Sequence, residues 1–278
     1  MRWPTAWVVL LALASSCRPL PPDPGFDPEV RVAAGVAPLA LDFGGARWEP
    51  GFAEQHWDVG AQGERSAGLW IPDTPRPRSV VVLLHGAIVK VQSQRGMDPS
   101  SVTRTLITCL AAPALSELSP LIIAPHSVDG QWWNTADTEF VLGLVAAARR
   151  RWPELAARSV ITGYSNGGIA TWYFARLYPE YFSAAIPMAF NESIAGPTPL
   201  PVYAIQGEKD ELFPIAPIRA ATSALMAKGF DITLNVRYRA GHMNPCAYEP
   251  ELALAGQWLE RYAFPKAIAP RSGDRFTP

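Results

Sequence analysis

The sequence is poor in the residues that build metal centres. Its 278 residues include three cysteines and four histidines, no C-x-x-C pair occurs, and the histidines stand far apart at positions 56, 85, 126 and 242. Protein metal sites need such ligands at close and recurring spacing. We therefore expect no metal site in this protein.

An excess of charge of either sign is also absent. The chain has 24 basic and 25 acidic residues, for a net charge of -1. A nucleic-acid-binding protein carries a basic excess and a disordered chain has low hydrophobicity, whereas 49% of these residues are hydrophobic. The chain is therefore expected to be globular, without a nucleic-acid partner. Its length suits one large α/β domain or two small ones.

The N-terminal apolar run, residues 6–14, is too short to span a bilayer comfortably. It follows Arg2 and is followed by small residues and Cys17, which is typical of a secretory signal. The segment before Cys17 resembles a bacterial lipobox, although Leu13 lies one place further from the cysteine than the commonest pattern requires. A lipobox implies that Cys17 is the lipid anchor of an exported protein on an outer or cell-surface membrane. The alternative is a plain signal peptide and a secreted or periplasmic protein.

This N-terminal pattern divides the chain into four predicted parts. Residues 1–16 form the lipoprotein signal peptide, and the proline-rich residues 17–29 form an extended tether. Residues 30–264 form one domain, and residues 265–278 form a C-terminal tail. Cys109 and Cys246 remain within that domain, where export would permit a disulfide, but the sequence leaves open whether they meet.

From residue 79 onward, short β-branched runs alternate with longer helix-like stretches. Such alternation is typical of a mainly parallel sheet covered by helices. We expect strands at 79–85, 121–125, 159–164, 184–189, 201–207 and 233–238, helices at 98–118, 138–152, 166–178, 218–229 and 251–262, and an antiparallel edge formed by 31–43 and 66–71.

One serine stands in the segment ITGYSNGG, which has the form G-x-S-x-G with Gly163, Ser165 and Gly167 in the required places. The pattern by itself also fits an ordinary glycine-rich turn. Here, however, Ser165 follows a predicted strand and precedes a predicted helix, which is the setting of a nucleophile elbow. The sharp turn strains the backbone of the serine, and small neighbours provide clearance. Ser165 is therefore the candidate nucleophile.

A serine hydroxyl needs a base, and the base needs an orienting carboxylate. Asp210 and His242 follow Ser165 in the order serine, acid, histidine, each in a loop after a predicted parallel strand. The carboxyl ends of such strands open on the same edge of a sheet. Glu208, Glu211 and Asp137 remain alternatives for the carboxylate.

An oxyanion hole needs two backbone N–H donors. The start of the helix after Ser165 offers the N–H of Asn166. His85-Gly86 directly follows a predicted strand, which makes the N–H of Ala87 the second candidate. His85 is then expected to hold its loop in place and to transfer no protons.

The segments LLHG, GYSNGG, GEKDELFP and AGHMN, spread over residues 79–264, resemble those of α/β-hydrolases. More narrowly they are similar to secreted esterases of the polyhydroxybutyrate-depolymerase-like, feruloyl-esterase-like and dienelactone-hydrolase-like kinds. The resemblance implies the α/β-hydrolase fold, with helices on both faces of the sheet, no cofactor, and a triad of Ser165, Asp210 and His242. The chain departs from lipase-like members because its connection at 191–200 is too short for a large cap domain.

We therefore predict a serine carboxylic-ester hydrolase that acts through an acyl-enzyme on small or short-acyl esters. Trp132 and Trp133 follow the strand at 121–125 and are candidates for the substrate pocket, or they pack against the domain. Two other functions remain open: a serine peptidase of the prolyl-oligopeptidase type, and an inactive hydrolase-fold binding protein. The natural substrate, the acyl length and the oligomeric state are not encoded in any motif.

Overall fold

The computed structural model describes residues 36–44, 48–74, 76–87, 99–128 and 130–264. Its centre is an eight-stranded sheet with the strand order β1-β2-β4-β3-β5-β6-β7-β8. The strands are β1 (Gly51–Asp58), β2 (Glu64–Ile71), β3 (Ser79–Leu84), β4 (Pro120–Pro125), β5 (Ser159–Tyr164), β6 (Ala184–Met188), β7 (Val202–Gly207) and β8 (Ile232–Arg237). Strands β3 to β8 pair in parallel, whereas β1 and β2 form an antiparallel edge.

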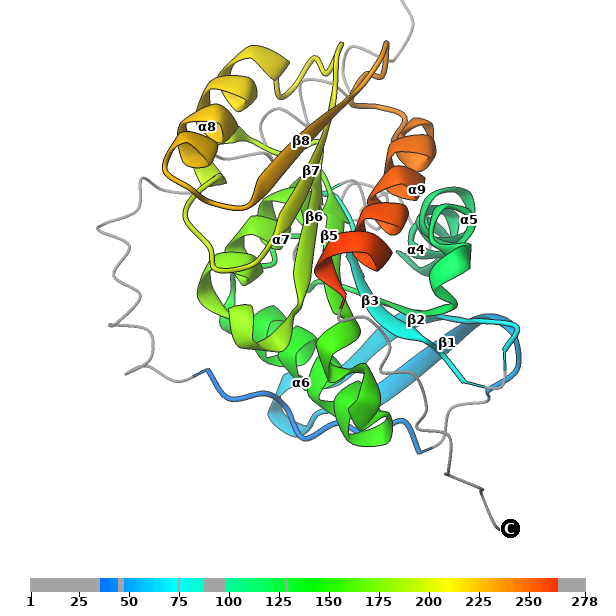
Figure 1. The fold of residues 1–278 in the computed structure, drawn as a ribbon. Coiled ribbons are helices and arrows are strands. Elements are labelled where there is room, and N and C mark those ends of the chain that lie inside the picture. The colour runs from blue at the N-terminus through cyan, green and yellow to red at the C-terminus, as the bar shows by residue number, and fades with distance from the viewer. Residues whose placement is uncertain (1–35, 45–47, 75, 88–98, 129, 265–278) are drawn as a thin grey trace, which may run out of the picture.

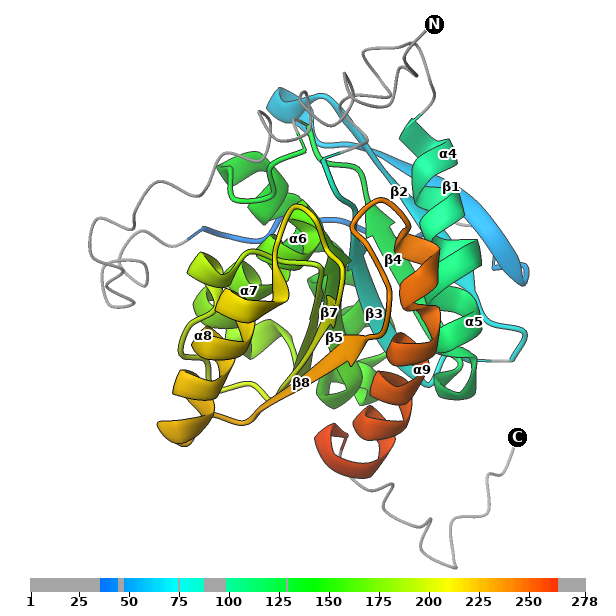
Figure 2. The ribbon, with the colours of Figure 1, turned by 90° about the horizontal axis from the view of Figure 1, so that it is seen from above.

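Helices cover both faces of this sheet (Figures 1 and 2). One face carries α6 (Thr135–Arg151), α7 (Asn166–Leu177) and α8 (Ile215–Ala227), and the other carries α4 (Pro99–Leu106), α5 (Ala112–Ala114) and α9 (Glu249–Trp258). Successive side chains of a strand point to opposite faces. In β3, accordingly, Val81 and Leu83 pack under α4 and α9, while Val82 and Leu84 pack under α6 and α7. The mainly parallel sheet with helices on both faces is therefore confirmed.

The antiparallel edge was predicted partly wrongly. The strand at 66–71 exists as part of β2, but within the predicted strand at 31–43 the described residues, from Val36 onward, have no strand structure. The partner of β2 is instead β1, which pairs with it from Gly51 opposite Ile71 to Asp58 opposite Glu64. Strand β1 lacks a clear alternation, since Trp57 is its single buried residue. Its pattern therefore gave no strand signal.

Several helices also differ from prediction, among them α8, which begins at Ile215 and not at the expected Ile218. Helix α6 begins three residues earlier than expected, because the side chain of Asn134 caps it by accepting a hydrogen bond from the N–H of Asp137 at 2.7 Å. The predicted helix at 98–118 is broken into α4, a π-helical turn (Ile107–Ala111), α5 and a 3-10 turn (Ser116–Leu118). Pro113 lies inside this stretch and has no N–H for a regular helix.

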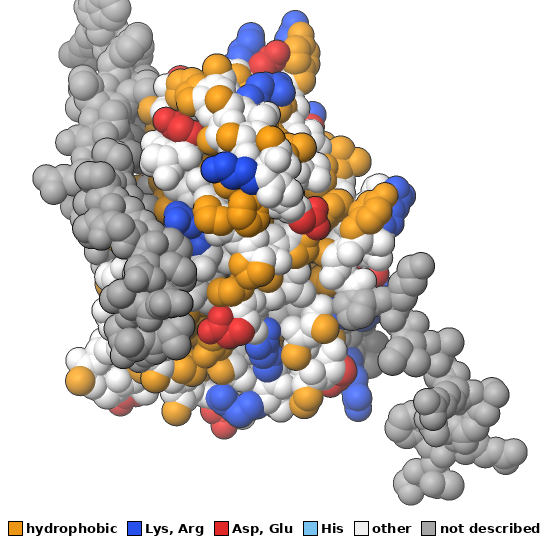
Figure 3. All heavy atoms as spheres, turned by 60° about the vertical axis from the view of Figure 1, so that its left-hand side comes forward, with side chains coloured by type: hydrophobic (Ala, Val, Ile, Leu, Met, Phe, Trp, Pro, Cys, Tyr) orange, Lys and Arg blue, Asp and Glu red, His pale blue; other side chains and the backbone are white. Residues whose placement is uncertain are grey.

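The connection between β6 and β7 holds a single 3-10 turn (Glu192–Ile194), so no cap domain is inserted there. On the face drawn in Figure 3, Lys and Arg side chains are interspersed with Asp and Glu, and hydrophobic side chains lie between them. That face therefore carries no large field of one sign. In the described part of the chain, no helix is both long and apolar enough to cross a membrane.

Candidate active site

Ser165 lies in a sharp turn between β5 and α7. Its backbone has φ 58° and ψ -120°, outside the regions that most L-residues adopt. The turn is closed by a hydrogen bond from the Ser165 N–H to the carbonyl of Met188 at 3.0 Å. The strand, the strained serine and the helix are those of the predicted nucleophile elbow.

The neighbouring glycines are required by close backbone approach. A Cβ at Gly163 would lie 2.4 Å from the carbonyl oxygen of Gly167, and one at Gly167 would lie 1.9 Å from that of Leu84. Neither backbone atom has room to move, because both belong to the core elements β3 and α7. Glycine at these positions lets the turn pack directly against β3.

His242 contacts both Ser165 and Asp210. Its Nδ1 lies 2.9 Å from Asp210 Oδ2 and its Nε2 lies 2.9 Å from Ser165 Oγ. A carboxylate accepts hydrogen bonds only, so Nδ1 carries the proton and Nε2 accepts from the serine hydroxyl. The imidazole is buried and lies between the rings of Tyr164 and Phe213, with centroids 5.6 and 5.1 Å away.

The structure distinguishes among the carboxylates that the sequence left open near His242. Asp210 faces the imidazole and also accepts hydrogen bonds from the N–H groups of Leu212 and Phe213, at 3.0 and 2.8 Å. Glu211 instead accepts from the backbone N–H of His242 at 2.8 Å. Glu208 accepts from the backbone N–H of Arg239, three residues before His242, at 2.9 Å. Asp210 is therefore the carboxylate that orients the ring.

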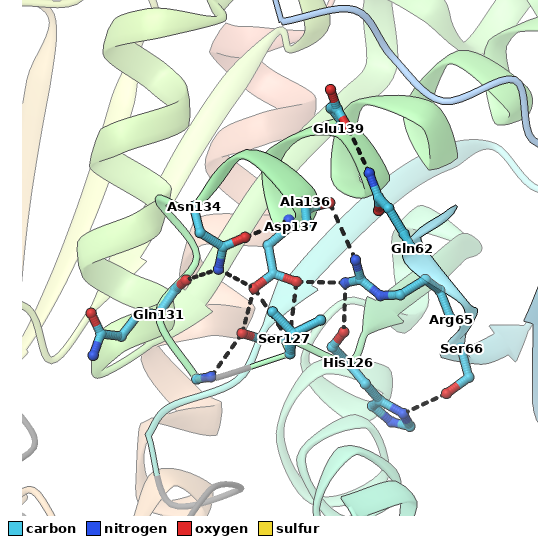
Figure 4. A network of polar contacts seen from close by, with 12 residues as sticks. Gln62, Arg65, Ser66, His126, Ser127, Gln131, Asn134, Ala136, Asp137 and Glu139 are labelled. Carbon is cyan, nitrogen blue, oxygen red and sulfur yellow. Dashed lines mark hydrogen bonds and ion pairs between the residues drawn. The ribbon is translucent and has the colours of Figure 1, made fainter. Parts of the chain in front are cut away.

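Asp137, the remaining alternative, lies in a separate polar network (Figure 4). It forms a buried ion pair with Arg65, and its Oδ2 accepts from Ser127 Oγ at 2.6 Å and from Asn134 Nδ2 at 2.8 Å. This network holds residues 126–128 and 130–134 against β2 and the start of α6. Nothing in the sequence predicted the pairing of Arg65 with Asp137.

His85 belongs to the loop after β3 and is fully buried. Its Nδ1–H donates to the Gly86 carbonyl at 2.9 Å, and its Nε2 accepts from the Ser127 N–H at 3.2 Å. Burial lowers the pKa of His85 to about 4, so the ring is neutral at neutral pH. These contacts support the prediction that His85 holds its loop.

Gly86 brings this loop against the elbow, since a Cβ on it would lie 3.1 Å from the Cβ of Ser165. The next residue, Ala87, is buried beside it. On the other side of Ser165, Asn166 is the first residue of α7, and its side chain donates to the Gly130 carbonyl at 3.1 Å. Both predicted oxyanion residues thus lie in segments adjacent to Ser165.

The two tryptophans proposed for the pocket have different positions. Trp132 is completely buried, its indole N–H donates to the His85 carbonyl at 2.9 Å, and its ring packs on the imidazole of His85. It therefore supports the loop from inside and presents no face to a substrate, which corrects the expectation that it lines the pocket. Trp133 is half-buried beside the same core, so a pocket role stays a prediction for it.

Cys109 and Cys246 form a disulfide between the π-helical turn after α4 and the 3-10 turn (Pro245–Tyr248) that follows His242. The sequence had left this pairing open. Among the described residues, no group of three or more His, Cys, Asp or Glu side chains is arranged to hold a metal. Cys17, the signal peptide, the tether and the C-terminal tail lie outside the described residues.

No protein-family model and no curated protein matches this chain. Solved structures do match. A thermostable esterase is 23% identical with a TM-score of 0.52, over 76% of this chain and 61% of its own, so this chain spans about three fifths of that protein. A fluorophosphonate-binding serine hydrolase of Staphylococcus aureus is 14% identical with a TM-score of 0.59, over 76% of this chain and 99% of its own.

An acylaminoacyl peptidase is also similar, at 14% identity and a TM-score of 0.55, over 77% of this chain and 42% of the peptidase. At such identities the likeness is one of fold. The order of the strands, the helices on both faces and the elbow after β5 agree with it. This chain has the α/β-hydrolase fold.

Proposed function

We propose that this protein is a serine carboxylic-ester hydrolase with Ser165 as nucleophile, His242 as general base and Asp210 as the orienting carboxylate. One observation carries the proposal: His242 Nε2 lies 2.9 Å from Ser165 Oγ while its Nδ1 lies 2.9 Å from Asp210. A neutral imidazole held in this tautomer can take the serine proton as Oγ attacks.

In the first half of the reaction, Ser165 Oγ attacks the ester carbonyl and its proton passes to His242 Nε2. The carbonyl electron pair moves onto oxygen, where the N–H groups of Asn166 and Ala87 would stabilise the negative charge. Collapse of this intermediate expels the alcohol, which takes the proton from His242. Water then attacks the acyl-enzyme by the same route, and the acid leaves as Ser165 regains its proton.

The absence of a cap between β6 and β7 supports a preference for short acyl groups. A long chain would find no additional domain to cover it at this position. Trp133, which is half-buried near the loop that contacts Asn166, is the aromatic residue proposed for the pocket. Highest activity on a twelve-carbon ester in a p-nitrophenyl ester series from two to twelve carbons would overturn the short-acyl proposal.

The test of the nucleophile is covalent labelling by a fluorophosphonate probe. We expect the protein to react and the S165A variant to remain unlabelled, because the serine oxygen is the atom that the probe traps. A protein that keeps the fold as a binding module would not react. Peptide substrates belong in the same assay, because the acylaminoacyl peptidase shares the fold. Cleavage of peptides in preference to all esters would favour the peptidase alternative.

We also propose that Cys17 is the lipid anchor of an exported protein. The apolar run before it supports this, and the disulfide between Cys109 and Cys246 fits an oxidising compartment. In bacterial cells, a palmitate analogue should label the protein and not its C17S variant. Equal labelling of both would contradict the anchor and favour a plain signal peptide.

A further inference from the structure

Tyr164 directly precedes Ser165 in the chain, and its side chain reaches the loop of His242. Its hydroxyl donates to the backbone carbonyl of His242 at 2.7 Å. Its ring also packs on the imidazole, at 5.6 Å between centroids. Tyr164 is therefore joined to Ser165 by a peptide bond and to His242 by a side-chain hydrogen bond.

Tyr248 makes a similar contact with Asp210, the third member of the proposed triad. It is completely buried, and its hydroxyl lies 3.5 Å from Asp210 Oδ2, on the oxygen that faces His242. Gly207 makes room for it, since a Cβ there would lie 2.4 Å from the Tyr248 hydroxyl oxygen. The Cys109–Cys246 disulfide joins the short turn that contains Tyr248 to the π-helical turn after α4, within the same helical layer.

The two tyrosines also contact each other. Their rings meet at 85° with centroids 5.1 Å apart, and their hydroxyl groups lie within hydrogen-bonding reach. Burial raises the pKa of both phenols above the ordinary value. Both hydroxyls therefore keep their protons at neutral pH and remain hydrogen-bond donors.

We infer that Tyr164 and Tyr248 form a positioning pair that sets the distance between the three members of the proposed triad. Those members lie on separate loops after β5, β7 and β8, and the tyrosine pair contacts all three. Proton transfer from Ser165 depends steeply on the position of the imidazole. This inference rests on the proposed function, and the two hydroxyls act through the His242 carbonyl and Asp210 Oδ2.

The test compares Y164F and Y248F with Y203F. We expect Y164F to lower kcat on a short p-nitrophenyl ester about tenfold and Y248F about threefold, with KM changed less than about twofold in both. The smaller effect of Y248F reflects its longer contact with Asp210. In Y203F a tyrosine of similar burial loses a hydrogen bond with Asn235 at the far end of β7, and kcat should not change.

A second measurement does not depend on turnover. The Nδ1–H proton of His242 should give a downfield NMR resonance, assigned by its loss in H242Q, because it donates to a carboxylate. We expect this resonance to shift or broaden in Y164F and Y248F but not in Y203F. The resonance reports the position of the imidazole relative to Asp210. A general loss of stability would not change this resonance in the two variants alone.

The inference is overturned if Y164F and Y248F both keep kcat within about twofold of the starting protein and leave the resonance unmoved. Equal losses in Y203F would also overturn it, because they would show a general effect of buried hydroxyls. If the unaltered protein neither hydrolyses esters nor reacts with the fluorophosphonate, the proposed function fails. The NMR comparison then still decides whether the tyrosines position His242.

Discussion

Asp210 and Asp137 are both buried aspartates whose side chains have no exposed surface, yet they differ in what surrounds them. Asp137 is paired with a permanent cation, Arg65, and its oxygens accept further hydrogen bonds from the 127–134 segment (Figure 4). Asp210 faces a histidine whose second nitrogen meets a serine hydroxyl. The network of Asp137 includes an arginine, which does not give up its proton. The network of Asp210 includes the imidazole of His242, which can take up and release one.

Burial alone therefore does not mark a functional carboxylate. A buried carboxylate whose donors are an arginine and fixed loop groups stabilises a loop, because none of those donors takes part in proton transfer. A buried carboxylate that orients a titratable ring can support chemistry. In this protein the first kind holds residues 126–128 and 130–134, and the second holds His242.

The largest effect is expected from D210N. The variant should fold and bind ester, while kcat falls by up to about ten-thousand-fold, because the amide no longer holds His242 in the required tautomer. Steady-state kinetics beside a thermal melt will measure this, with S165A as the reference for complete loss. A D210N enzyme that kept more than about a tenth of kcat, an effect under ~1.4 kcal/mol, would show that the carboxylate role is misassigned.

The reverse pattern is expected for D137N. Removing the charge leaves Arg65 buried without its ionic partner, so the free energy of unfolding should fall by about 3 to 5 kcal/mol. Urea titration will measure it, and kcat per folded molecule should stay far closer to the starting value than in D210N. The control is E260Q, which breaks the more exposed pair with Arg158 and should cost less than about 1 kcal/mol. An equal loss of unfolding free energy in D137N and E260Q would contradict the structural role assigned to the buried Arg65–Asp137 pair.

His85 lies between the two regions. It accepts from the N–H of Ser127, whose hydroxyl donates to Asp137, and its neighbour Gly86 packs against Ser165. Its pKa is about 4 in the folded protein against 6.5 ordinarily, owing to burial. The unfolded chain therefore binds a proton first, so the stability due to neutral His85 is complete above pH 6.5 and is lost as pH falls toward 4, by about 3 kcal/mol.

Urea titrations at several pH values between 7 and 4 will test this pH dependence. We expect H85N to show a shallower loss of stability across this range than the unaltered protein. H56N, which changes an exposed histidine, should keep the original slope. An unchanged slope in H85N would contradict the assignment to His85.

The smallest effects are expected from E208Q and E211Q. Both glutamates accept hydrogen bonds from backbone N–H groups, and glutamine keeps an oxygen that can accept the same bond. Each variant should therefore keep kcat within about threefold, against the large loss in D210N. A drop in E211Q comparable to that of D210N would make Glu211 part of the catalytic apparatus.

Local patterns predicted the parts of this molecule that depend on neighbouring residues. The runs of β-branched residues predicted β3 to β8, and the glycines around Ser165 predicted the elbow, because both are decided within a few positions of the chain. Strand β1 was missed because it has one buried residue, Trp57, and no alternation. The early start of α6 was missed because it depends on the cap provided by Asn134.

The sequence by itself determined the parallel strands β3 to β8, the strained serine and the order of serine, acid and histidine. The tertiary structure decided which carboxylate meets the imidazole, that Trp132 is internal, that Cys109 meets Cys246, and that Tyr164 and Tyr248 contact the site. Ser165 and His242 are 77 positions apart, and Asp210 and His242 are 32 apart. Side-chain contacts over such separations arise from how the strands and helices pack, and no local periodicity encodes them.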